Sequence, residues 1–186
     1  MLLTRLIYLL FFLSLGLISF SEPRVLTPGH YRILQGEVVY RASTALSTWS
    51  GRNNTISGSF SWGEDGKLEG RICVDQSAWD SGNPLRDAHT RRMFEVDRYP
   101  FACFLPSAIL LQGEKVDLEG KLDLHGKTRP WSLSGNYSEE TASRASLHLL
   151  GQVNLKAWDL KPPRLLSLEV NDRVEVSVSV RIERIK

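Results

Sequence analysis

The chain has 186 residues, with 23 Lys and Arg against 21 Asp and Glu, and 42% of its residues are hydrophobic. This composition is typical of a globular protein of one domain and excludes disordered, collagen-like and coiled-coil proteins. The net charge of +2 argues against a nucleic-acid-binding protein, which needs a clustered basic surface.

The N-terminal segment has the pattern of a secretory signal peptide. One positive charge precedes the apolar run Leu6–Phe20, and this run is shorter than the ~18–20 residues that span a bilayer. Ser19 and Ser21 have the spacing that a signal peptidase reads. We expect a signal peptide over 1–21, cleaved after Ser21, and an exported, periplasmic domain over 22–186. The alternative is an uncleaved membrane anchor.

The mature chain is dominated by alternation of apolar and polar residues, which is typical of half-buried strands. Eight strands are expected, over residues 31–40, 56–62, 68–75, 101–111, 116–124, 129–137, 145–155 and 174–182. The strands follow one another through short turns, so the sequence predicts an all-β, antiparallel protein, either a barrel of about eight strands or a sandwich. Similar strand lengths favour the barrel. No helices alternate with the strands, which excludes a parallel α/β fold.

The segment Asn83–Met93 lacks this alternation and is expected to form one short inserted helix. Asn83 is a good capping residue, and Pro84 suits the first helical position. One stripe of this helix holds Leu85, Ala88, His89, Arg92 and Met93, and the helix is expected to lie on or over one end of the sheet.

The inward face of the expected barrel is the main candidate binding site. An eight-stranded barrel is filled by side chains or holds one small ligand. The residues expected to line this bore are Phe60, Trp62, Gly70, Ile72, Val74, Phe104, Gly120, Leu122, Leu124 and Trp131. Glycines in the inward row either leave room for a ligand or relieve bends in the strands. A slender apolar chain suits such a bore, since each buried CH₂ contributes about 0.8 kcal/mol.

Arg86, Asp87 and His89 are the candidate polar residues at the mouth of the bore. Asp87 and His89 resemble an acid–base pair, but residues two apart on a helix do not face each other. We therefore interpret all three as residues that shape the mouth or contact a polar head group, and not as catalytic residues.

No other pattern supports an enzyme or a metalloprotein. His30, His125 and His148 are scattered and have no metal-ligand spacing. Gly126–Thr128 lacks the preceding glycine of a phosphate loop, and there is no nucleophile elbow of a serine hydrolase. We expect a non-enzymatic protein with no cofactor and no metal.

Cys73 and Cys103 lie on either side of the expected helix, out of phase with the apolar residues beside them. If their strands pair antiparallel, the two sulfur atoms are neighbours on the outer face. A structural disulfide is compatible with an exported protein, and two free thiols are the alternative.

Several segments together resemble the YceI-like family. They are Ile56–Phe60, Gly70–Ile72, Ser81–His89, Tyr99–Phe104, Gly120–Leu122 and Gly126–Pro130. The resemblance covers roughly residues 55–135 and is specific in the combination of Ser81–His89 with Tyr99–Phe104. It implies a lipocalin-like barrel, exported to the periplasm, that holds a polyisoprenoid or related amphiphilic lipid such as a prenyl quinone.

The expected function is thus transport, storage or sequestration of a long-chain lipid. Transient contact with a membrane and formation of a homodimer are further candidate interactions. Two alternatives remain open at this stage. One is a ligand-free interaction or stress-related module, and the other is an enzyme that acts on a lipid-like substrate.

Overall fold

The computed structural model describes residues 26–162, 164–165 and 168–185 of the chain. The expected signal peptide, residues 1–21, lies outside these described residues. Within them, no helix is both long and apolar enough to cross a membrane.

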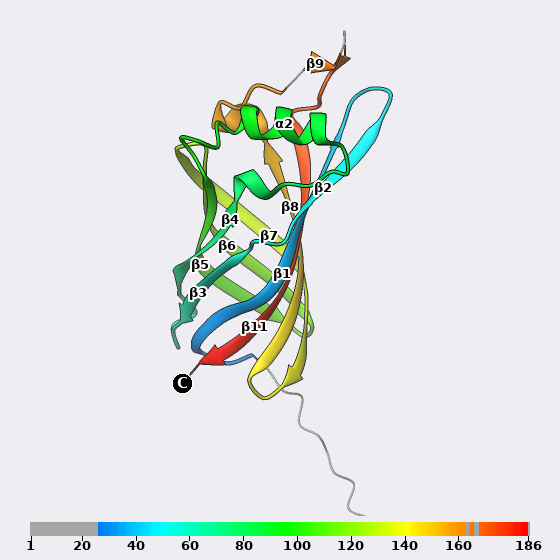
Figure 1. The fold of residues 1–186 in the computed structure, drawn as a ribbon. Coiled ribbons are helices and arrows are strands. Elements are labelled where there is room, and N and C mark those ends of the chain that lie inside the picture. The colour runs from blue at the N-terminus through cyan, green and yellow to red at the C-terminus, as the bar shows by residue number, and fades with distance from the viewer. Residues whose placement is uncertain (1–25, 163, 166–167, 186) are drawn as a thin grey trace, which may run out of the picture.

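The molecule is an antiparallel β-barrel, as the alternation of residues predicts (Figure 1). Eight strands close the barrel in the order β1, β3, β4, β5, β6, β7, β8 and β11, and β11 pairs back with β1. These strands are β1 (Gly29–Ser43), β3 (Ser57–Trp62), β4 (Leu68–Asp75), β5 (Phe101–Gln112), β6 (Lys115–Leu124), β7 (Lys127–Thr141), β8 (Arg144–Asn154) and β11 (Arg173–Ile185).

Three short strands were not expected from the sequence. β2 (Thr48–Asn53) pairs with β1 beyond the part of β1 that pairs with β3. β9 (Arg164–Leu165) and β10 (Leu168–Glu169) form a separate two-stranded sheet. None of the three has the long period-two pattern that reveals the barrel strands.

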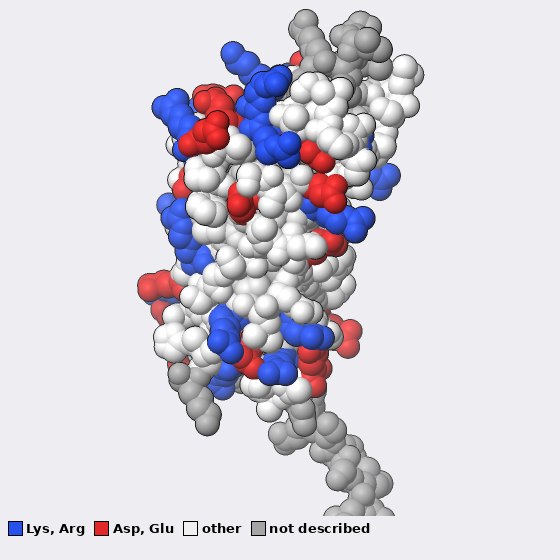
Figure 2. Space-filling model, viewed as in Figure 1, with Lys and Arg blue, Asp and Glu red and all other residues white. Residues whose placement is uncertain are grey.

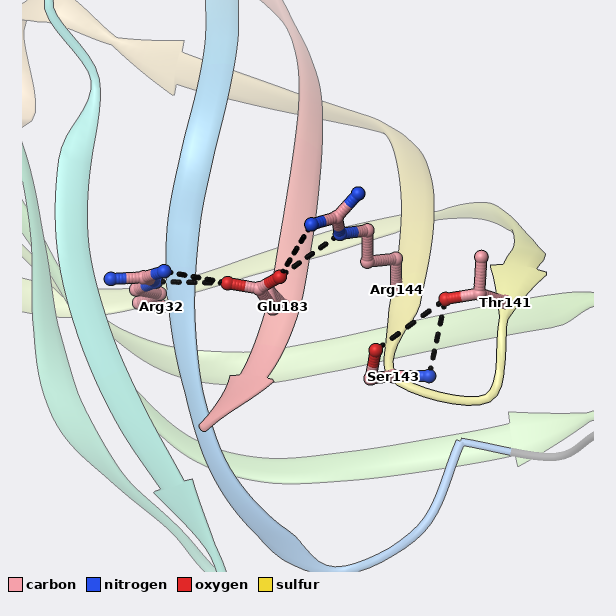
Figure 3. Close-up of polar contacts among 5 residues, drawn as sticks. All are labelled: Arg32, Thr141, Ser143, Arg144 and Glu183. Carbon is pink, nitrogen blue, oxygen red and sulfur yellow. Dashed lines mark hydrogen bonds and ion pairs between the residues drawn. The ribbon is translucent and has the colours of Figure 1, made fainter. Parts of the chain in front are cut away.

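The first and last barrel strands are held together by a carboxylate between two arginines (Figure 3). Glu183 on β11 accepts hydrogen bonds from Arg32 on β1, with the shortest N–O distance 2.6 Å, and from Arg144 on β8, at 2.8 Å. These contacts join three adjacent strands on the outer surface where the barrel closes.

One end of the barrel is covered by the inserted helix (Figure 1). β4 continues into the 3₁₀ turn η1 (Gln76–Ala78), which is followed by α2 (Pro84–Met93). The Asn83 side chain caps α2 by accepting hydrogen bonds from the backbone N–H groups of Leu85 and Arg86, both at 3.1 Å. A second 3₁₀ turn, η2 (Leu155–Trp158), follows β8 at the same end.

Candidate functional site

The barrel encloses an apolar cavity of about 220 Å³. Its lining extends from Tyr31 on β1 and Ile182 on β11, at the end of the barrel opposite α2, to His89 and Met93 of α2. Barrel strands present alternate side chains to the interior, so the period-two pattern of the sequence becomes a continuous apolar wall.

Eight of the ten residues expected to line the bore do so: Phe60, Trp62, Ile72, Val74, Phe104, Leu122, Leu124 and Trp131. Neighbouring rings pack on one another within this wall. Phe60 stacks on Tyr31 with ring centroids 5.3 Å apart, and Phe104 meets Trp131 edge to face at 5.6 Å.

Gly70 and Gly120 occupy the inward rows of β4 and β6, yet neither lines the cavity. A Cβ on Gly70 would overlap the carbonyl oxygen of Ser59, and one on Gly120 would overlap that of Leu105. The Gly120 Cβ would also lie 2.8 Å from the ring of Phe104. The absent side chains therefore let strands and rings approach closely, and they leave no space for a ligand.

The charged and hydrophilic side chains of the cavity lie near η1 and α2, while at the opposite end the indole N–H of Trp62 is buried with no hydrogen-bond partner among the described residues. The hydrophilic lining residues are Gln76, Arg86, His89 and Thr90, so two of the three expected mouth residues face the cavity. Asp87 does not. It is buried, and its carboxylate accepts hydrogen bonds from the backbone N–H and the hydroxyl of Ser81, at 3.0 and 2.5 Å.

Two residues of the expected stripe, His89 and Met93, face the cavity. Arg86, His89, Thr90 and Met93 line the cavity, whereas Leu85 is 67% exposed. The helix thus turns mainly polar side chains toward the barrel, and Leu85 faces solvent.

Arg86 is fixed in place by contacts on both sides. Its Nε donates to the Ser81 hydroxyl and its Nη2 to the Ser81 carbonyl, both at 2.8 Å. Its guanidinium carbon lies 5.7 Å from the ring centroid of Trp49 on β2. Arg86 brings a positive charge to this end of the cavity, and the buried Asp87, which shares Ser81 with it, partly offsets this charge.

Tyr40 lies beside this polar group and was not identified from the sequence. Burial raises the pKa of the Tyr40 hydroxyl above its usual 10.0, and the nearby Thr90 hydroxyl and, less strongly, Arg86 partly offset this. The raised pKa keeps Tyr40 a neutral phenol at physiological pH, and its buried hydroxyl has no hydrogen-bond partner among the described residues. Tyr40 continues the inward row of Val38 and Ala42 on β1, so the period of that strand could have identified it, whereas Trp49 lies in β2, which shows no regular alternation.

Cys73 and Cys103 form a disulfide, with their residues directly opposite each other on β4 and β5. The bond joins the two strands that lead into and out of the η1–α2 segment. In the described part of the chain, no three His, Cys, Asp or Glu residues are grouped to bind a metal ion.

Comparison with known proteins agrees with this architecture. A UPF0312 protein of Pseudomonas putida (strain W619) is 26% identical over 162 residues, which cover 81% of this chain and 82% of the relative. A UPF0312 protein of Vibrio parahaemolyticus is 33% identical over 92 residues, and the match spans about half the length of either protein, 47% of this chain and 49% of the relative.

Two solved structures have the same fold. BcnA of Burkholderia cenocepacia has a TM-score of 0.69 at 16% identity, covering 78% of this chain and 95% of BcnA. A polyisoprenoid-binding domain from Saccharophagus degradans also has a TM-score of 0.69, at 20% identity, covering 83% of this chain and 98% of that domain. A family model for the YceI-like domain matches residues 28–182, most of the chain. The protein belongs to the YceI-like family.

Proposed function

We propose that this protein is an exported carrier that holds a long-chain isoprenoid, or a similar amphiphilic lipid such as a prenyl quinone, inside the barrel. The observation that carries the proposal is the continuous apolar cavity whose charged and hydrophilic side chains lie at one end. This distribution matches a molecule with a long apolar tail and one polar head. The polyisoprenoid-binding domain with the same fold supports the same ligand class.

The energetics favour a tail over a compact polar ligand. Each buried CH₂ contributes about 0.8 kcal/mol, so a tail of about 15 carbons gains on the order of 10 kcal/mol before ordering costs. A sugar or nucleotide would leave most of its donors and acceptors unpaired against this wall, which is costly.

The head group is assigned to the α2 end, near Arg86, His89 and Thr90. Arg86 offers a positive charge, so an acceptor-rich head such as a carbonyl, carboxylate or phosphate is favoured over an amine. Asp87 acts indirectly, because its bonds to Ser81 hold the loop to which Arg86 is anchored. In this role the protein binds and releases its ligand without catalysis and requires no cofactor.

The direct test is to purify the mature protein from its native compartment without detergent, extract it with organic solvent and identify the extract by mass spectrometry. We expect one prenyl-type lipid in near-equimolar amount. An empty extract from folded protein would overturn the proposal and favour a ligand-free interaction module.

A matched pair of variants on β11 tests whether the lipid lies in the barrel. Val178 is buried and lines the cavity, whereas its neighbour Ser177 belongs to the outward-facing row. Val178→Trp is expected to displace the lipid from the extract, and Ser177→Trp to leave it unchanged. Equal lipid content in both variants would place the ligand elsewhere.

A further inference from the structure

The β1–β2 hairpin ends in an ordered turn beside the α2 end of the barrel (Figure 1). The backbone N–H of Thr44 donates to the carbonyl of Ser47 at 2.8 Å. The Thr44 hydroxyl accepts from the backbone N–H groups of Leu46 and Ser47, at 3.3 and 3.2 Å. The turn therefore presents Leu46 in a defined position, and Leu46 is 81% exposed.

The hairpin has an uncharged tip with positive charges at its base. Residues 42–51 contain no Asp, Glu, Lys or Arg, and Figure 2 shows uncharged surface where the hairpin lies, at the upper right. The only charged residues between Val38 and Asn53 are Arg41 and Arg52, one on each strand and both exposed. Neither has an ion-pair partner within the part of the chain that the structure describes.

A second exposed leucine lies at the same end. Leu85, on the first turn of α2, is 67% exposed, and the next residue, Arg86, packs over Trp49 of the hairpin. Leu46 and Leu85 are the two most exposed large hydrophobic residues in the described chain. α2 is itself basic, with Arg86, Arg91 and Arg92 against the buried Asp87.

We infer that this end of the barrel docks on the surface of a phospholipid bilayer containing anionic lipids, with Leu46 and Leu85 inserted among the head groups. Separate leucines on protruding elements do not form the contiguous patch of about 800 Å² that a stable protein partner covers. An interfacial bilayer region accepts such side chains one by one, and anionic head groups attract the nearby arginines. The inference rests on the proposed function, because docking there would place the polar end of the cavity against the source of a lipid.

The test is co-sedimentation of the purified protein with vesicles of phosphatidylcholine alone and with vesicles of phosphatidylcholine and phosphatidylglycerol in equal amounts. We expect binding to the mixed vesicles and much weaker binding to the neutral ones. Leu46→Asp and Leu85→Asp should each weaken binding by about ten-fold or more, as expected for a buried leucine. Arg41→Gln and Arg52→Gln should each weaken it by about five-fold.

Leu110→Asp is the matched control. Leu110 is 54% exposed on β5, close to the end of the barrel opposite α2, and its substitution should leave vesicle binding unchanged. Leu46→Ser, which adds no charge, should weaken binding in the same direction as Leu46→Asp. Thermal unfolding of each variant confirms that it is folded.

The inference would be overturned if the wild-type protein does not bind the mixed vesicles. It would also be overturned if Leu110→Asp and Leu46→Asp weaken vesicle binding equally. A protein that instead forms dimers sensitive to Leu46→Asp would assign this surface to a second copy of the chain. Lipid content measured without vesicles separates this test from that of the proposed function, since Leu46→Asp should retain its bound lipid.

Discussion

Cys73 and Cys103 face each other across adjacent strands, and their disulfide closes the part of the chain that contains η1 and α2. β4 and β5 pair only over Ile72–Asp75 and Phe101–Phe104. The bond therefore fixes the two strands where their pairing is short and where the cap of the cavity begins and ends.

The disulfide should add measurably to stability. The two cysteines are 30 residues apart, and closing a loop of that length stabilises a fold by about 3–4 kcal/mol in the chain-entropy model. Urea unfolding with and without a thiol reductant should show a loss of this order. The variant with Cys73→Ser and Cys103→Ser should have the lower stability of the reduced protein, and the reductant should not change it. Two titratable thiols in denatured, unreduced protein would contradict the bond.

Gly120→Ala should destabilise the barrel without filling its cavity. The new Cβ would overlap the carbonyl oxygen of Leu105 and crowd the ring of Phe104, and overpacking of this kind costs about 1–3 kcal/mol. Denaturant unfolding measures the loss. Ser132→Ala, at an exposed position of the adjacent strand β7, is the control. A fully stable Gly120→Ala that loses its lipid would restore the interpretation of Gly120 as space for the ligand.

The barrel could be predicted from the sequence because each of its strands is marked by a pattern of neighbouring residues. Each barrel strand alternates apolar and polar residues over a long enough stretch to show its period, and the Asn83-Pro84 start of α2 carries a local capping signal. The inward side of Phe60, Trp62 and Ile72 follows from that period alone.

The remaining features depend on contacts between distant segments. The gap at Gly120 is taken by Phe104 and Leu105 of the neighbouring strand, which no pattern within β6 reveals. Likewise, Arg86 faces the cavity because Ser81 and Trp49 hold it there. The exposure of Leu85 follows from how α2 lies across the barrel end, which the helical spacing of residues 83–93 does not reveal.

The ion pairs of Glu183 should make stability depend on pH. Hydrogen bonds from Arg32, and then from Arg144, lower the pKa of Glu183 below its usual 4.5. A carboxylate with a lowered pKa in the folded state stabilises the fold above the unfolded-state pKa, and this contribution is lost as pH falls through the folded-state pKa. The stability difference between wild type and Glu183→Gln should therefore be largest near neutral pH and should be lost only as the pH falls through the lowered folded-state pKa of Glu183.

Urea midpoints measured for both proteins from neutral to acidic pH test this dependence. Added salt should reduce the difference, because the arginines are partly exposed. Glu37→Gln, on β1, is the control, since the structure shows no ion pair for Glu37. A difference between wild type and Glu183→Gln that stays constant with pH would show that the ion pairs do not contribute.

Asn83→Ala should loosen α2 while leaving the barrel folded. The Asn83 side chain accepts two backbone hydrogen bonds at the start of the helix, and losing such a cap costs about 1 kcal/mol. Amide hydrogen exchange in α2 should accelerate by about five-fold relative to wild type, with the barrel strands unchanged. Asn54→Ala, which changes an exposed asparagine outside the helix, should alter exchange in neither α2 nor the barrel strands.

Because α2 covers the polar end of the cavity, bound lipid should also exchange faster in Asn83→Ala. Unchanged lipid exchange despite a loosened helix would mean that the ligand enters elsewhere.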